Sequence, residues 1–277
     1  EELFLFGKVE PSQLARDSSN YVSDYHIRRS VVEKTLSSIA ENARIVLFDG
    51  FPCDGKTLLA ADLAYRLSGS RPVYQMRQAY DNILDEVAAI LHHAPNAALI
   101  VENCFDLPPE KLGSIARQFD GHEGVLILTS RAVAVDASPA GLGALKDLPS
   151  FLRMPVVRLD SIEVQTLSDL ADQIAGWRDF HALDRDARLR FIENTCQSSL
   201  PHFLMRLLRS DYVANRYREE FNKLSLESAE RSAVIVALYV AHIGENAPVS
   251  FLSNALGTDF GAIIDRLNLR SGSESFH

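Results

Sequence analysis

The sequence predicts an α/β fold, in which a parallel sheet flanked by helices precedes an all-helical region. Short apolar runs alternate with helical patterns from about residue 44 to residue 160, as expected for parallel strands joined by helices. Only helical patterns follow residue 160. In addition, a glycine-containing loop joins the first apolar run to a long helical pattern, which is the order of a strand leading into a helix.

Each predicted strand is a short run of aliphatic or β-branched residues. The runs cover residues 45–48, 72–76, 98–101, 125–129 and 156–159. Pro109 and Glu110 predict the start of a helix that runs to about Phe119, because proline suits a first helical turn and acidic side chains favour its positive end. The stretch 132–150 contains small residues such as Gly141 and predicts a loop with one helical turn.

Helical spacing continues after the sheet region. The predicted helices cover residues 161–177, 184–196, 201–208, 212–223 and 229–242. A turn at 244–248, with helices from Ser250 and Phe260, predicts a helix-turn-helix or a winged-helix core that lacks its wing strands. The expected division of the chain is a linker or tail of a preceding domain at 1–20, a sheet domain at 21–160, a helical lid at 161–227, a truncated winged-helix domain at 228–270 and a disordered tail at 271–277.

Composition limits the class of protein. The chain has 277 residues, 47% of them apolar, enough for roughly two domains. It has no apolar stretch long enough to span a membrane and no signal-peptide pattern, so we expect a soluble, cytoplasmic protein without membrane partners. Because it begins with Glu1, we expect it to be a piece of a longer chain. Cys53, Cys104 and Cys196 form no C-x-x-C pair, which argues against a disulfide framework and a zinc site.

The net charge of −9 disfavours a broad nucleic-acid-binding surface and favours protein partners or small anions held in a pocket. The charge alone therefore argues against a nucleic-acid partner, although a local basic patch can exist within an acidic total.

The loop at residues 50–57 reads Gly50-Phe51-Pro52-Cys53-Asp54-Gly55-Lys56-Thr57 and fits the phosphate-binding pattern G-x-x-x-x-G-K-[ST]. Its glycines let backbone N–H groups turn inward around a phosphate, and the next helix directs its positive end to the same anion. Lys56 is expected to reach the outer phosphates and Thr57 to offer its hydroxyl to Mg²⁺. The predicted nucleotide contacts are Gly50, Asp54, Gly55, Lys56, Thr57 and Leu58.

Acidic residues follow the predicted strand at 98–101. Nucleotide hydrolases need an acid at a strand end beside the phosphate loop, to orient Mg²⁺ and hold its coordinated water. We therefore predict Glu102 as a Mg²⁺ ligand, together with Thr57, and as a catalytic residue; the alternative is a surface carboxylate at a strand end. Asp106 is either a catalytic residue that orients the attacking water or the N-cap of the following turn.

Arg131 follows the predicted strand at 125–129. Ligands of open parallel sheets lie outside the carboxyl ends of the strands, where an arginine can pair with the terminal phosphate and assist catalysis. The alternative is a surface salt bridge.

The sequence resembles the STAND NTPases, the signal-transducing relatives of the NACHT and NB-ARC modules. The resemblance rests on Arg28 or Arg29 before the first strand, the loop at 50–57, the strand that ends in Glu102, and Leu128-Thr129-Ser130-Arg131. In the helical region, Ser198-Ser199-Leu200-Pro201 resembles the G-x-P segment of that group. The resemblance implies a P-loop NTPase fold that uses ATP or ADP with Mg²⁺, with Pro201 packed on the base and Arg28 or Arg29 contacting base or sugar.

Three departures from the family pattern are visible. Glu102-Asn103 stands where the family has aspartates, so hydrolysis is expected to be slow or absent. Ser198 or Ser199 replaces the glycine of the G-x-P segment, and the late histidine of the winged-helix domain has no match.

The resemblance implies a switch in which ADP holds a closed state and ATP permits self-association. The expected parent is a multidomain, prokaryotic antiviral defence protein, with effector and sensor domains in the same full-length chain. Two alternatives remain: an ATP-regulated DNA-binding transcriptional regulator, and a nucleotide-locked scaffold that does not hydrolyse. The first is disfavoured because its recognition helix at 261–270 carries only Arg266 and Arg270 as basic residues.

Overall fold

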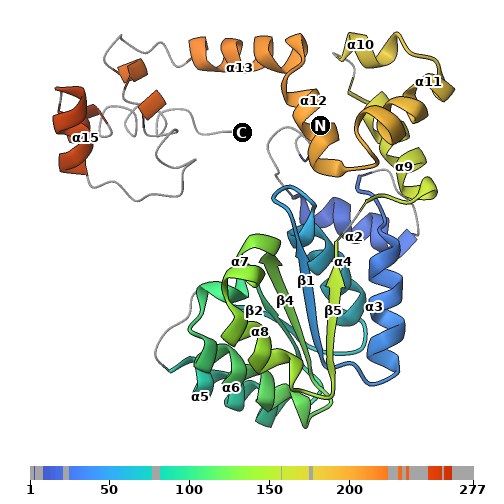
Figure 1. Cartoon of the computed structure of the whole chain (residues 1–277), viewed down its shortest axis with the longest axis vertical. Helices are drawn as coiled ribbons and strands as arrows, with labels where there is room; N and C mark the ends of the chain where they lie inside the picture. The colour runs from blue at the N-terminus through green and yellow to red at the C-terminus, as the bar shows by residue number, and fades with distance from the viewer. Residues whose placement is uncertain are drawn as a thin grey trace. The chain divides into compact units, whose positions relative to one another are not determined.

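The fold is taken from a computed structural model (Figure 1). It describes residues 3, 9–20, 25–76, 82–156, 158–174, 177–223, 230–232, 235–236, 249–257 and 259–263. The chain divides into two compact units, Glu1–Val213 and Ala214–His277.

A five-stranded parallel sheet forms the centre of the first unit. Its order is β2-β3-β4-β1-β5, and every strand pair is parallel. The strands are β1 (Ile45–Gly50), β2 (Val73–Met76), β3 (Ala98–Val101), β4 (Val125–Arg131) and β5 (Phe151–Pro155). The predicted α/β class is confirmed, and four strands lie where the sequence placed them. Both β1 and β4 extend further at their carboxyl ends, to Gly50 and Arg131, which are register partners.

The fifth strand is a correction. We expected it at residues 156–159, but β5 ends at Pro155 and lies just before that range. It is an edge strand that pairs with β1 alone, so its residues are only partly buried and Arg153 interrupts the apolar run. Proline is tolerated at the end of an edge strand, where its missing N–H breaks no ladder. Val156 and Leu159 of the expected range lie beyond the end of β5 and are buried.

Helices cover both faces of the sheet. They are α3 (Ser30–Ala40), α4 (Lys56–Ser68), α5 (Ile83–His93), α6 (Pro109–Asp120), α7 (Ala132–Ala137) and α8 (Pro139–Lys146). Alternate side chains of β1 point to opposite faces. Ile45 and Leu47 accordingly join the core under α5, α6 and α8, whereas Val46 and Phe48 join the core under α3 and α4 (Figure 1).

Two segments without a clear sequence pattern are helical. The expected loop at 132–150 contains α7 and α8, so that prediction is wrong. Its small residues permit close packing rather than turns: a Cβ on Gly141 would lie 2.9 Å from a ring carbon of Phe105. Residues 11–20 form α2 (Pro11–Asn20), where we expected no regular structure. A tertiary contact holds this helix, since the Ser18 hydroxyl donates to Asp62 Oδ1 at 2.7 Å.

The helical region of the first unit follows β5. It contains α9 (Ser161–Asp172), α10 (Arg178–His181), α11 (Arg185–Arg190), a π-helical turn η2 (Phe191–Thr195), α12 (Leu200–Leu208) and the first residues, up to Val213, of α13 (Asp211–Lys223). The expected helix at 161–177 is shorter, because α9 ends at Asp172. Trp177 instead packs in a cluster of rings with Phe180, Phe191 and Phe203. These rings belong to a core separate from those of the sheet.

The second unit is described only in part. Its helix α15 (Val249–Leu256) confirms the helix expected from Ser250, and residues 230–232, 235–236 and 260–263 are helical. The expected turn at 244–248, the rest of the third helix and the tail at 271–277 lie outside the described residues. The winged-helix assignment and the proposed domain limits therefore stay predictions. None of the helices in the described segments is long and apolar enough to cross a membrane.

Candidate phosphate-binding site

The predicted phosphate loop lies between the end of β1 and the start of α4. Cys53 and Gly55 have φ angles of 66° and 80°, in the left-handed region that a glycine adopts at little cost. Gly50 is closely surrounded, since a Cβ there would lie 2.7 Å from Asp54 Oδ2 and 3.1 Å from the backbone oxygen of Val156. The loop therefore turns tightly over the carboxyl end of β1, and α4 begins directly behind it with Lys56.

Lys56 lies across the loop. Its Nζ donates to the carbonyl oxygens of Gly50 at 3.1 Å and Phe51 at 2.6 Å. Burial lowers the pKa of Lys56, and the carboxylate of Asp54 opposes that shift. The ammonium group is therefore held at the loop by main-chain acceptors rather than by an ion pair with a carboxylate.

Asp54 turns its carboxylate into the loop. Its Oδ2 accepts from the backbone N–H of Phe51 at 2.5 Å, and the side chain is buried. Burial raises the pKa of Asp54, whereas the Phe51 hydrogen bond and the charge of Lys56 lower it. One of the backbone N–H groups that a phosphate would use is thus already hydrogen-bonded to a carboxylate.

Thr57 and Glu102, the two predicted Mg²⁺ ligands, are brought together. The Thr57 hydroxyl donates to Glu102 Oε2 at 3.3 Å. The other carboxylate oxygen, Oε1, accepts from Nε2 of Gln75 on the neighbouring strand β2 at 3.2 Å. Hydroxyl and carboxylate oxygens are the hard donors that Mg²⁺ prefers, and the ion commonly completes its shell with phosphate oxygens and water. Among the described residues no three His, Cys, Asp or Glu side chains gather as a metal site, so these two donors would need such partners.

Gln75 was missed by the sequence reasoning. The sequence does place Gln75 near the carboxyl end of a predicted strand. Only the order of the strands in the sheet shows that this strand lies beside the one that ends in Glu102.

Asp106 lies in the short 3₁₀ turn η1 (Cys104–Asp106), and its side chain is exposed. The N-cap of α6 is Pro108, and that of η1 is Asn103, so Asp106 is the N-cap of neither. It therefore stays a candidate for orienting water.

Arg131 ends β4 next to Gly50, and its charge lowers the pKa of Lys56 after the larger effect of burial. Among the described residues it forms no ion pair, which leaves it available to an anion at the loop.

The two arginines before α3 have different surroundings. Arg28 directs Nη2 to the carbonyl oxygens of Asp17 at 3.4 Å and Ser18 at 3.3 Å, in α2. Arg29 is buried, donates from Nη1 to the carbonyl of Asp54 at 3.4 Å and pairs through Nε with Glu163 Oε2 at 3.0 Å. Of the two alternatives, Arg29 is therefore the one that touches the loop.

Glu163 ties the helical region to this site. It belongs to a capping box at the start of α9 with Asp160, and it also accepts from the backbone N–H of Ser30 at 2.7 Å. The pattern Asp160-x-x-Glu163 could have predicted the helix start, but not the ion pair with Arg29.

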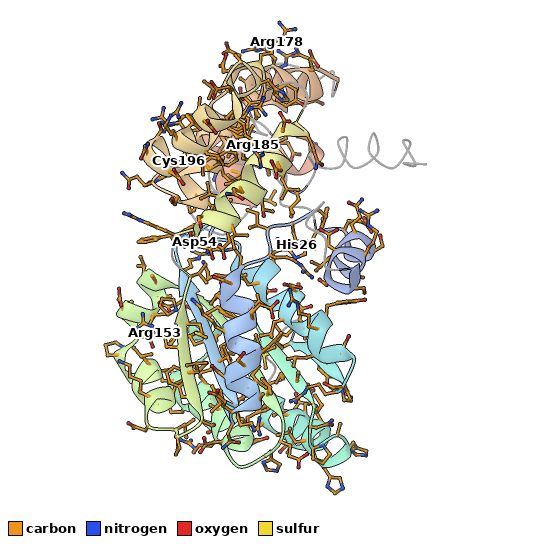
Figure 2. All side chains as sticks on the ribbon, turned by 90° about the vertical axis from the view of Figure 1, so that its right-hand side faces the viewer. His26, Asp54, Arg153, Arg178, Arg185 and Cys196 are labelled. Carbon is orange, nitrogen blue, oxygen red and sulfur yellow. The ribbon has the colours of Figure 1, made fainter. Side chains whose placement is uncertain are left out.

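A cavity of about 590 Å³ opens beside the loop. Its size lies in the range of small-molecule sites. Figure 2 places Asp54 and His26 near each other, at the end of the sheet toward the helices of this unit. Most of the lining is apolar. It includes Pro52, Cys53, Asp54, Gly55, Thr57 and Leu58 of the loop and α4, His26, Ile27 and Arg29 before α3, and Leu200, Pro201, Leu204, Met205 and Leu208 of α12.

No protein-family model and no curated protein matches this chain. Solved structures with detectable similarity include the RuvB Holliday junction branch migration motor of Thermotoga maritima, with 16% identity and a TM-score of 0.40, covering 89% of this chain and 88% of that one. They also include Cdc6p from Pyrobaculum aerophilum, with 9% identity and a TM-score of 0.47, covering 98% of this chain and 90% of that one. At such values the likeness carries no conclusion about this chain.

Proposed function

We propose that this chain binds a nucleoside triphosphate with Mg²⁺ and acts as a slowly hydrolysing ATPase switch. The observation that carries the proposal is the 3.3 Å hydrogen bond between the Thr57 hydroxyl and Glu102. It lies beside the loop at 50–57, in which Cys53 and Gly55 have positive φ angles, and beside a cavity large enough for a nucleotide. Two oxygen donors from different elements, placed at a helix N-terminus that follows a parallel strand, suit a magnesium–phosphate group.

Several of the predicted residues have a role in this proposal. The loop amides and Lys56 hold the phosphates, and Arg131 approaches the terminal one from β4. Thr57 and Glu102 hold Mg²⁺, which neutralises charge on the phosphate oxygens when it is bound. The base enters the apolar part of the cavity, between Leu58 and Pro201.

Hydrolysis is proposed to be slow because Glu102 is engaged on both sides. One oxygen contacts Thr57 and the other contacts Gln75, so the carboxylate must leave Gln75 to orient a water. The same contacts favour the non-hydrolysing scaffold as the second candidate. Its distinguishing property is nucleotide binding without turnover.

The switch itself is proposed from the shared lining of the cavity. Residues of the phosphate loop and of α12 line the same space, so a ligand there would contact the sheet and the helical region together. A ligand that binds two arrangements unequally shifts their populations. In keeping with the STAND resemblance, we propose that exchange of ADP for ATP permits self-association of a cytoplasmic, multidomain defence protein. The DNA-binding alternative has no support among the described residues, since most of its recognition helix lies outside them.

Single-turnover release of phosphate from Mg²⁺-ATP tests this function. We expect slow release by the wild-type chain and loss of release in Glu102→Gln, which keeps the side-chain shape but loses the charge. Glu110→Gln, at an exposed position in the first turn of α6, is the matched control and should release phosphate like the wild type. Binding without any release would favour the scaffold. Equal release by wild type and Glu102→Gln would refute the role of Glu102.

A further inference from the structure

A buried arginine joins the phosphate loop to the first helix of the helical region. Arg29 is 7% exposed, and its Nη1 donates to the main-chain carbonyl oxygen of Asp54 at 3.4 Å, a long hydrogen bond. Its Nε pairs with Oε2 of Glu163, in the first turn of α9, at 3.0 Å. One guanidinium group therefore contacts both the loop and the helical region.

Glu163 fixes the position of this guanidinium group. Its side chain is buried, and Oε1 accepts from the backbone N–H of Ser30 at 2.7 Å. Oε2, the oxygen that pairs with Arg29, also accepts from the backbone N–H of Asp160 at 3.1 Å. Because both oxygens have main-chain donors, the carboxylate is held in one orientation. The charge-assisted bond to Arg29 then holds the arginine in one orientation as well.

The contact with Arg29 fixes the direction of the peptide group between Asp54 and Gly55. In a trans peptide group the N–H points away from the carbonyl oxygen, and no cis peptide bond occurs among the described residues. Since the Asp54 carbonyl is directed to Arg29, the Gly55 N–H is directed to the opposite side. Within the described ranges no acceptor is paired with this N–H. It is therefore available to an anion.

The same peptide group is able to turn over. Gly55 has a φ angle of 80°, and a glycine adopts positive and negative φ angles about equally readily. In the reversed orientation the Asp54 carbonyl oxygen, rather than the Gly55 N–H, would be directed away from Arg29. A phosphate would then meet an oxygen that repels it in place of a donor that binds it. The orientation that Arg29 stabilises is thus the one that suits a phosphate.

We propose that Arg29 and Glu163 are positioning residues that keep the Gly55 N–H directed to the phosphate. Binding of phosphate at the loop then depends on the position of α9, which carries Glu163. Glu163 is not part of the lining of the cavity, so it acts through Arg29 and not on the ligand. The proposal rests on the proposed function, because it assigns what holds the same phosphate site in shape.

Titration of inorganic tripolyphosphate tests it, since this ligand has no base or sugar. We expect Glu163→Gln to bind tripolyphosphate about tenfold or more weakly than the wild type. Charge alone predicts the opposite, because loss of a negative charge should strengthen binding of an anion. Glutamine is also suited to the third position of a capping box, so the start of α9 is kept. Asp169→Asn, an exposed carboxylate on the same helix, is the matched control and should bind like the wild type.

The amide spectrum of the ¹⁵N-labelled chain gives a second measurement, which needs no variant. Saturating tripolyphosphate should shift the Gly55 N–H signal of the wild type, because this group gains an acceptor. The shift should be smaller in folded, saturated Glu163→Gln, whereas a merely structural role of Glu163 would leave it unchanged.

Two results would overturn this proposal and leave the phosphate site standing. They are equal or tighter tripolyphosphate binding by Glu163→Gln, and an unshifted Gly55 signal in a wild-type chain that binds tripolyphosphate. If the wild type bound neither tripolyphosphate nor Mg²⁺-ATP, the proposed function would fail together with this proposal.

Discussion

The hydroxyl of Thr57 donates to Glu102 Oε2 at 3.3 Å, although the two residues lie 45 positions apart. Thr57 lies in the first turn of the helix behind the phosphate loop, and Glu102 follows the end of β3. Parallel strands bring their carboxyl ends to one edge of the sheet, so this contact is a consequence of the topology. In the site proposed above, the same two oxygens flank the place of the metal ion.

Loss of the Thr57 hydroxyl should weaken binding only when magnesium is present. We expect Thr57→Val to lower ATP affinity about tenfold or more in Mg²⁺ and to change it little in EDTA, because the hydroxyl serves the metal. Thr57→Ser keeps the hydroxyl and should behave like the wild type. Isothermal titration in both buffers measures this. An equal loss in Mg²⁺ and in EDTA would show that the residue acts on the fold rather than on the ion.

Removal of the Gln75 amide should speed hydrolysis. Gln75 holds Glu102 Oε1 at 3.2 Å, so Gln75→Ala frees the carboxylate to orient a water. Single-turnover phosphate release is expected to rise several-fold, while ATP affinity stays within about threefold of the wild type. Gln13→Ala, at an exposed position of α2, is the control. Slower release in Gln75→Ala would mean that the amide positions Glu102 for catalysis.

The carboxylate of Asp54 should oppose both stability and phosphate binding. Burial raises its pKa in the folded chain, so the folded state holds this proton more tightly than the unfolded state does. The stability that Asp54 contributes is then fully present below its ordinary pKa of 3.8 and is lost as pH rises through the higher folded value. Relative to Asp54→Asn, the wild-type free energy of unfolding should fall as pH rises from about 4. Urea unfolding of both proteins at several pH values measures it, and a constant difference would refute the shift.

The same substitution should strengthen phosphate binding. Asp54 Oδ2 takes the Phe51 amide at 2.5 Å, and a neutral amide side chain would compete less well with a phosphate. Asp54→Asn is therefore expected to bind tripolyphosphate more tightly than the wild type at neutral pH. Weaker binding would show that Asp54 shapes the loop for the ligand.

The ring cluster of the helical region should dominate its stability. Phe203 is fully buried and contacts Trp177 and Phe180, with ring centroids at 5.3 and 6.0 Å. Phe203→Ala is expected to cost about 3–5 kcal/mol in the free energy of unfolding, because it leaves a cavity. Met205→Ala, on the same helix but 46% exposed, should cost much less. Similar losses in the two variants, measured in urea, would contradict this packing.

The sequence predicted the elements whose signals are local. The buried strands β1, β3 and β4 are apolar on both faces, and the glycine loop lies where the pattern placed it. The edge strand β5 was placed too late because the runs 151–155 and 156–159 each contain one arginine and composition does not separate them; the pairing to β1 defines the strand. For the same reason α2 was missed: its contacts with α4, such as that of Ser18 with Asp62, join residues 44 positions apart.

Within the candidate site, local motifs identified the loop, Thr57 and Glu102. Residues that reach the site through the strand order or from distant helices could not be predicted, because a single sequence does not show which elements are neighbours in the fold. Gln75 beside Glu102 and Glu163 beside Arg29 are of this kind.

The central claim is that the 50–57 loop binds the phosphates of a nucleotide. Isothermal titration of Mg²⁺-ATP into the wild-type chain, Lys56→Ala and Lys34→Ala tests it most directly, because Lys34 is an exposed lysine on α3. We predict saturable one-to-one binding by the wild type and Lys34→Ala, and a loss of about a hundredfold or more in Lys56→Ala. Absence of binding by the wild type, or equal affinities for wild type and Lys56→Ala, would contradict the claim.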